Sequence, residues 1–170
     1  MNNKAVFHEV QYQPMWLRII MLGVGAIIFI IMYQQVMLGY SIGTHPAPDW
    51  LMIVIWAFVG VLLPLFASFS RLEIQVNDKG VYYRFFPLQP RFIFIPFSGI
   101  SSIEALTFNP LWNTGGWGIR WGLGGICYLV RGNQGVRFTL DSGKRILLGS
   151  QRSNELFEIT EEKRKRHLSS

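Results

Sequence analysis

The chain has 170 residues, half of them hydrophobic, with one cysteine and a formal net charge of +6. A single cysteine excludes an intrachain disulfide and a metal cage of several thiolates. The length allows one membrane unit and one small domain with its own core, and it excludes a second domain of similar size. Residues 16–70 are strongly apolar, whereas residues 71–170 have the composition of a soluble domain.

The charges are unevenly distributed. Of the 16 Lys and Arg residues only Lys4 and Arg18 precede residue 71, and of the 10 Asp and Glu residues only Glu9 and Asp49 do so. The whole positive excess therefore falls in the C-terminal part. It indicates either contact with anionic lipid headgroups or simply the cytoplasmic side of a membrane protein, since Lys and Arg accumulate on that side.

Residues 1–15 are expected to form a cytoplasmic N-terminal segment, followed by a transmembrane helical hairpin over residues 16–70. The first span, about 16–38, runs from Trp16 to Leu38, which is long enough for a hydrocarbon core of about 30 Å. Its one charge, Arg18, lies at the edge, where its side chain can extend to the headgroups. The stretch is too long for a cleaved signal peptide, and no small-residue cleavage site follows it.

The second span, about 50–68, contains Pro64. A proline removes one backbone hydrogen bond and crowds the carbonyl four residues earlier, at Gly60, so a kink is predicted there. Gln34 and Gln35 are polar residues near the end of the first span. They indicate either an interhelical hydrogen bond or polar path, or solvated side chains at the membrane boundary.

The link from Gly39 to Asp49 has no Lys or Arg, whereas both outer flanks carry them. The positive-inside rule then predicts a two-span cell-membrane protein with both termini in the cytoplasm and the link outside. Asp49 is expected to cap the second helix.

From residue 71 the apolar period changes to two, as in Leu72, Ile74 and Val76, which is typical of strands. A mainly-β domain is predicted over residues 71–162, with about seven strands and a C-terminal helix. Turn residues separate the strands, which are expected at 71–76, 81–86, 91–95, 100–108, 126–130, 136–140 and 144–148. Residues 163–170 form a basic tail without an apolar face, and we expect this tail to fray.

Several motifs are spread along the chain: Pro46–Trp50, Arg84–Pro87, Gly115–Arg120, Gly132–Val136 and Ser142–Arg145 leading to Leu148–Gln151. In these motifs the chain is similar to an uncharacterised bacterial and archaeal family, in which two membrane helices precede a bacterial pleckstrin-homology-like (PH-like) domain. This resemblance implies a PH-like fold for residues 71–162 but no established activity.

Signatures of catalysis and of cofactor binding are missing from the sequence. The glycine-rich runs do not have the spacing of a phosphate-binding loop. His8, His45 and His167 lie apart, without a carboxylate cluster, so no metal site is expected. Glu73 and Glu104 fall on polar strand faces and are predicted to be solvated. We therefore expect a protein that is not an enzyme, has no cofactor and, lacking a recognised motif, does not bind nucleic acid.

The segment from Trp112 to Trp121 contains the candidate binding residues Trp112, Trp117, Arg120 and Trp121. Tryptophan favours the headgroup zone of a bilayer and arginine pairs with phosphate, so one interpretation is a recognition or membrane-contacting loop. The other is a structural bend, in which the tryptophans pack into the sheet edge with Arg120 stacked on them.

Two functions remain open. The first is a membrane-anchored PH-like binding or scaffold module, whose partner is an anionic lipid headgroup or a membrane protein. The second is an accessory subunit of a transporter or membrane enzyme, packed through small residues of the helices. These small residues are Gly23, Gly25, Ala26, Ala57 and Gly60.

Overall fold

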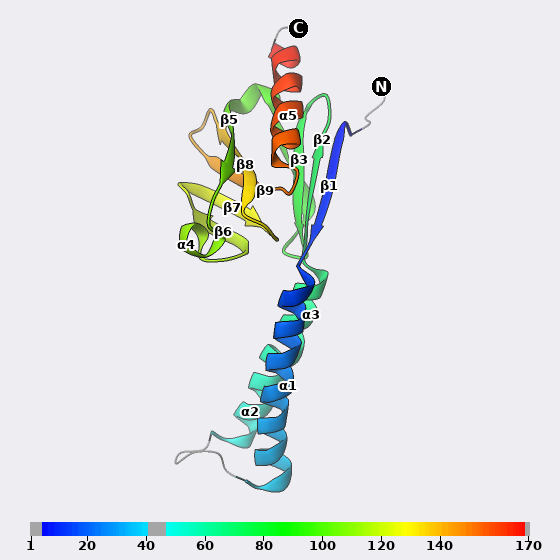
Figure 1. Ribbon diagram of the computed structural model, residues 1–170, viewed down its shortest axis with the longest axis vertical. Helices are drawn as coiled ribbons and strands as arrows, with labels where there is room; N and C mark the ends of the chain where they lie inside the picture. The colour runs from blue at the N-terminus through cyan, green and yellow to red at the C-terminus, as the bar shows by residue number, and fades with distance from the viewer. Residues whose placement is uncertain (1–4, 41–46, 169–170) are drawn as a thin grey trace. The chain divides into compact units, whose positions relative to one another are not determined.

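The computed structural model describes residues 5–40 and 47–168. The chain divides into two compact units, Gln13–Phe69 and Met1–Tyr12 together with Ser70–Ser170. We call the first the helical unit and the second the β-unit (Figure 1).

The helical unit contains two long apolar helices. The first is α1 (Met15–Leu38), which ends at Gly39 in the left-handed conformation. The second consists of α2 (Asp49–Ile55), the π-helical η1 (Trp56–Leu62) and α3 (Leu63–Phe69). These helices, of 24 and 21 residues, are long and apolar enough to cross a membrane.

A kink was predicted at Gly60, four residues before Pro64, and this segment is the π-helix η1. Pro64 has no N–H to donate to the carbonyl of Gly60, so the regular α-helical pattern fails at this point. The N–H of Leu63 instead bonds the carbonyl of Phe58, five residues earlier. The helix therefore continues through the proline with one widened segment.

The two helices approach closely where each has a glycine. A β-carbon placed on Gly25 would lie 2.8 Å from the carbonyl oxygen of Gly60, so only glycine fits there. Next to this contact the rings of Phe29 and Trp56 lie 5.3 Å apart. Small residues thus serve contact within the pair itself.

Gln35 makes the interhelical hydrogen bond that was one of its two interpretations. Its Nε2 donates to the carbonyl of Ala47 at 2.5 Å and to Oδ1 of Asp49 at 3.2 Å. Asp49 was expected to cap the second helix, but the cap position is Pro48, and no side chain bonds the helix end there. The carboxylate of Asp49 accepts from Gln35 instead.

The β-unit consists of two sheets (Figure 1). One has the order β1-β2-β3-β4 and the other β5-β8-β9-β7-β6. Neighbouring strands are antiparallel except β7 and β9, which are parallel. The strands are β1 (Phe7–Tyr12), β2 (Arg71–Val76), β3 (Gly80–Phe86), β4 (Gln89–Pro96), β5 (Ile100–Thr107), β6 (Gly118–Gly122), β7 (Gly125–Leu129), β8 (Gln134–Leu140) and β9 (Arg145–Gly149).

The core contains side chains from both sheets and from the C-terminal helix α5 (Ser153–Leu168). The predicted alternation of β2 is confirmed, because Leu72, Ile74 and Val76 are all fully buried. Phe138 of β8 and Leu156 of α5 join the same cluster. A β-rich region with two sheets and a C-terminal helix therefore agrees with the coarse fold predicted from the sequence.

The strand β1 corrects the expectation that residues 1–15 lie outside the domain. Phe7–Tyr12 pairs with β2 along its whole length, from Phe7↔Val76 to Tyr12↔Arg71. Two of its inward residues are polar: Oε2 of Glu9 accepts from the hydroxyl of Ser150 at 2.6 Å, and Gln11 donates to the carbonyl of Gly149 at 2.7 Å. Because these core-facing positions are polar, the sequence of β1 lacks the alternation of apolar and polar residues by which a strand is recognised.

The predicted loop after residue 108 also contains regular structure. It forms the short helix α4 (Pro110–Thr114) and the strand β6. Together with β1, β6 brings the strands in the described residues to nine, where about seven were predicted.

The basic tail does not fray within the described residues, because α5 continues to Leu168. Lys163 forms an ion pair with Asp78 at 2.5 Å, and Arg164 donates to the carbonyl of Ser101 at 2.8 Å. Lys165 pairs with Glu161 on the same helix at 3.7 Å. Charge pairs rather than an apolar face hold this last segment.

Replacing Glu9 by alanine should loosen β1. The hydroxyl of Ser150 and the N–H of Gln151, which donates to Oε1 of Glu9 at 3.0 Å, would lose their acceptor. The expected loss of unfolding free energy is about 1–3 kcal/mol. Denaturant unfolding in detergent measures it, with the exposed Glu158→Ala as the control. Equal stability of both variants would contradict a structural role for Glu9.

Candidate functional site

The candidate binding residues lie on one segment, Asn109–Gly122, which we call the α4–β6 rim. Asn109 starts α4 by accepting hydrogen bonds on its side chain from the N–H groups of Leu111 at 3.1 Å and Trp112 at 3.4 Å. Pro110 follows at the first helical position, where no N–H is needed. Gly115 ends α4 with a φ of 70°, a conformation that favours glycine. The sequence thus specifies a single short turn of helix.

The helix α4 packs closely on β6. A β-carbon placed on Gly122 would lie 2.5 Å from the carbonyl oxygen of Asn113. The hydroxyl of Thr114 is buried and donates to the carbonyls of Pro110 at 2.7 Å and Gly116 at 3.1 Å. Local hydrogen bonds and this close approach therefore position the side chains that the rim presents.

Two of the four candidate residues point into solvent. Trp112 on α4 is 87% exposed and Trp121 on β6 is 80% exposed. Leu111, next to Trp112, is 62% exposed. Large apolar side chains exposed together on one segment are typical of an interaction surface.

The other two candidates, Trp117 and Arg120, make contacts within the β-unit. Trp117 is half-buried, packs against the small cluster of Phe108, Cys127, Leu129 and Leu147, and donates through Nε1 to the carbonyl of Gly132 at 3.4 Å. Arg120 is exposed, and its Nε donates to the carbonyl of Trp117 at 3.2 Å. The structural interpretation therefore fits Trp117, which packs within the β-unit, whereas the side chains of Trp112 and Trp121 are exposed.

A surface hollow of about 400 Å³ adjoins the rim. The side-chain oxygens of Asn109 and Asn113 each accept a backbone N–H, which leaves their NH₂ groups as donors. Such a lining suits a ligand that carries acceptors, such as carbonyl or phosphate oxygens. The residues around the hollow are Thr107, Phe108, Asn109, Pro110, Asn113 and Asn133.

The sequence did not reveal this hollow. Asn133 belongs to the turn between β7 and β8, and it reaches the rim because its carbonyl accepts from the N–H of Phe108 at 2.8 Å. This contact joins segments that are distant in the sequence. The Asn-Pro pair at Asn109 was the available signal, since it favours the start of a turn.

A second polar cluster corrects the expectation that Glu73 is solvated. Glu73 is only 7% exposed. Its Oε2 lies 2.6 Å from Nη2 of Arg84, and its Oε1 accepts from His8 at 3.1 Å and from Gln75 at 2.9 Å. His8, assigned from the sequence to a tail outside the domain, is a residue of β1.

Two opposing effects act on the pKa of Glu73. Burial raises it, but hydrogen bonds from Arg84, His8 and Gln75 and the charge of Arg84 outweigh burial and hold the pKa below its ordinary value. Arg84 also lies over the ring of Phe92, 4.5 Å from its centroid. The cluster therefore keeps an ionised carboxylate on this sheet.

Cys127 is the one cysteine of the chain, and its thiol has surroundings that disfavour reaction. It is buried, and burial raises its pKa. Within residues 5–40 and 47–168, no three His, Cys, Asp or Glu side chains are grouped so that they could hold a metal.

Trp117→Ala and Trp112→Ala should separate structure from binding. Trp117→Ala removes a half-buried ring and should cost about 2–3 kcal/mol of unfolding free energy, below the loss for a fully buried aromatic residue. Trp112→Ala should cost less than about 0.5 kcal/mol, because its side chain is in solvent. Thermal and denaturant unfolding of both variants measures the difference, and equal losses would overturn the division of the rim.

The Glu73 cluster should make stability depend on pH in the acid range. Because its pKa in the folded state lies below the ordinary 4.5, ionised Glu73 stabilises the fold at neutral pH, and this stabilisation is lost as the pH falls below 4.5 through the folded-state pKa. Glu73→Gln should cost roughly 1–3 kcal/mol at pH 7 and flatten the acid dependence. The matched control is Glu104→Gln, since Glu104 forms a more exposed ion pair with Arg137.

Comparison with known proteins identifies the family only. Residues 2–162 match a family described as "Family of unknown function (DUF6141)". No curated protein and no solved structure matches the chain. Because the match extends over nearly the whole sequence, this chain, with its two apolar helices and its β-rich unit, belongs to the family of unknown function DUF6141.

Proposed function

We propose that this chain is a membrane-anchored binding or scaffold module. In this proposal the two helices form a hairpin in the cell membrane. The β-unit is a PH-like domain at the cytoplasmic surface, and it recognises its ligand through the α4–β6 rim.

The exposed apolar surface of the helices carries the membrane proposal. In the most apolar 18-residue stretch of each helix, only 11% of the stretch is buried. A core helix of a soluble protein would be covered by its neighbours, whereas Ile20, Ile27, Ile30, Val54 and Leu62 are exposed. Such a surface is stable in lipid and unstable in water.

The β1–β2 pairing supports a hairpin. Tyr12 and Arg71 are directly opposite each other in the ladder, and residues so placed lie about 5 Å apart. The helical unit starts and ends between these two residues, so the second helix must return to where the first began. Two spans achieve this, with both flanks on the same side.

The orientation follows from charge. Lys and Arg are absent from Gly39–Asp49 and present on both outer flanks. The positive-inside rule then places Tyr40 and Trp50 at the outer surface and the β-unit in the cytoplasm.

The PH-like assignment is supported by the order of the elements. Apart from the parallel pair β7 and β9, antiparallel strands form two sheets, and the one long helix of the described β-unit follows the last strand. The side chain of Leu156 on that helix is fully buried in the core between the sheets.

The rim favours binding over catalysis. Its exposed groups are aromatic rings, one guanidinium and uncharged amides. Amides donate and accept hydrogen bonds, but they do not exchange protons near neutral pH and are poor nucleophiles.

An accessory-subunit function has one observation in its favour. A groove of about 360 Å³ lies between the helices, and a partner helix could fill it. However, Gly25 and Gly60 already contact each other within the pair. The groove is lined by Leu22, Gly25, Ala26, Phe29, Trp56 and Gly60.

A cysteine-labelling experiment tests the anchoring. Tyr40→Cys should react with a membrane-impermeant maleimide in intact cells, because the link is outside. Glu158→Cys, on the β-unit, should react only after permeabilisation. Cys127 is buried and should contribute little background. The opposite labelling order would reverse the topology, and labelling of both sites in intact cells would exclude a cytoplasmic β-unit.

Purification in mild detergent distinguishes the two functions. Suppose that a second membrane protein is recovered in an amount equal to that of this chain. If the Ala26→Phe variant, which fills the groove, no longer recovers it, the accessory-subunit function is favoured. Recovery that instead depends on Trp112 and Trp121 would favour the binding module.

A further inference from the structure

The links between the two units are very short. Only Gln13 and Pro14 separate the end of β1 from the start of α1, and only Ser70 separates the end of α3 from the start of β2. Three residue steps of extended chain reach at most about 10 Å. If the helices span a membrane as proposed, the end of the first sheet that carries Tyr12 and Arg71 must therefore lie at the membrane surface.

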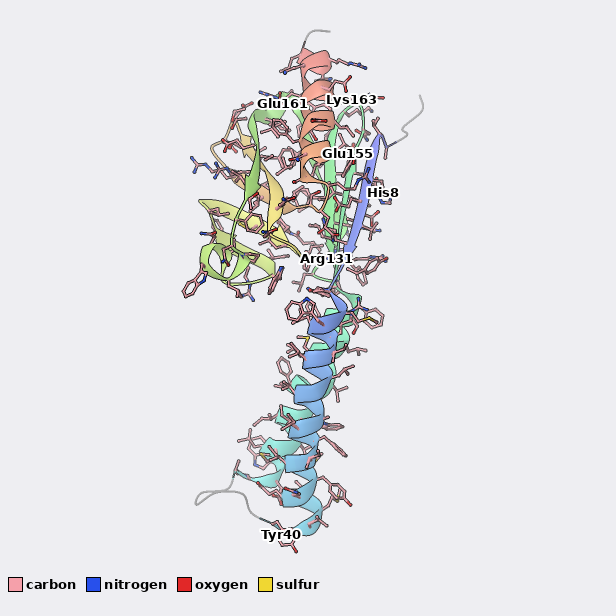
Figure 2. The ribbon with its side chains drawn as sticks, in the orientation of Figure 1. His8, Tyr40, Arg131, Glu155, Glu161 and Lys163 are labelled. Atoms are coloured by element: carbon pink, nitrogen blue, oxygen red, sulfur yellow. The ribbon has the colours of Figure 1, made fainter. Side chains whose placement is uncertain are left out.

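The α4–β6 rim lies at this same end of the β-unit. In Figure 1, α4 and β6 lie toward the end of the β-unit where β1 finishes, and the C-terminal end of α5 lies at the opposite end. Figure 2 places the labelled Arg131 at the rim's end and Glu161 and Lys163 at the other.

Exposed apolar side chains gather toward this end. Besides Leu111, Trp112 and Trp121 of the rim, Tyr12 and Leu88 are exposed. Leu88 lies in the turn between β3 and β4, next to Phe86, whose partner in the ladder is Arg71. If the domain is anchored in a membrane at this end, lipid is the nearest apolar phase that these exposed side chains can contact.

The polar groups of the rim's end also suit lipid headgroups. Arg71, Arg120 and Arg131 supply positive charge, and arginine pairs well with phosphate. The amide donors of the hollow suit phosphate and ester carbonyl oxygens. Indole rings favour the headgroup zone, where one end of the ring is apolar and the other is hydrated.

The basic tail does not share this position. Lys163, Arg164 and Lys165 belong to the opposite end of the β-unit, and each has a partner there: Asp78, the carbonyl of Ser101 and Glu161. The tail is therefore not the source of positive charge at the tethered end, where Arg71 ends the β1–β2 ladder.

Resting on the proposed anchoring, we infer that the α4–β6 rim is a bilayer contact: Leu111, Trp112 and Trp121 lie in the headgroup layer of the cytoplasmic leaflet. This contact holds the β-unit in one orientation on the membrane. The ligand that the rim recognises is then the lipid headgroup itself.

Nitroxide spin labels on the full chain test this inference. The chain is placed in nanodiscs of equal parts phosphatidylcholine and phosphatidylglycerol, in a Cys127→Ala background with one new cysteine per variant. Trp121→Cys and Trp112→Cys report on the rim, Glu158→Cys on exposed α5, and Ile30→Cys on the first helix. Accessibility to oxygen, which concentrates in lipid, is compared with accessibility to an aqueous nickel complex.

The expected result is a several-fold higher ratio of oxygen to nickel accessibility at positions 121 and 112 than at 158, with the highest ratio at 30. Ratios at 121 and 112 equal to that at 158, with position 30 still protected from nickel, would overturn the rim contact and leave the anchoring intact. Free nickel access at position 30 would overturn the anchoring itself. Either rim label suffices if the other variant does not fold.

Discussion

The architecture depends on the pairing of two strands across the whole helical unit. The ladder from Phe7↔Val76 to Tyr12↔Arg71 joins segments that are separated in sequence by both long helices. The helical unit is therefore an insertion between neighbouring strands of one sheet rather than an appendage before the domain. Glu9 and Gln11 strengthen the pairing, because they tie β1 to the end of β9 and the residue after it.

This arrangement explains which parts of the fold could be predicted. The helices could be predicted because a long run of apolar residues is visible in the local sequence. Strands such as β2 could be predicted because Leu72, Ile74 and Val76 alternate with polar residues. The strand β1 was missed because Glu9 and Gln11 occupy core-facing positions, where hydrophobic residues are expected. Their partners, at Gly149 and Ser150, are supplied by the far end of the chain.

The candidate site was predicted in part for a similar reason. Composition singled out Trp112, Trp117, Arg120 and Trp121, but composition cannot say which side of a bend a ring occupies. That depends on the small cluster around Cys127, which Trp117 joins and Trp112 does not. The hollow depends on the contact between Phe108 and Asn133, a pairing that no local pattern specifies.

The insertion also has a consequence for how the protein is made. The strand β1 leaves the ribosome first, and its partner β2 follows only after both helices have been synthesised. The first sheet therefore cannot close until the helical unit is complete, and closing it brings together positions that are far apart in the chain, which is slow for non-local pairing. If the helices insert into a membrane as proposed, insertion precedes completion of the β-unit.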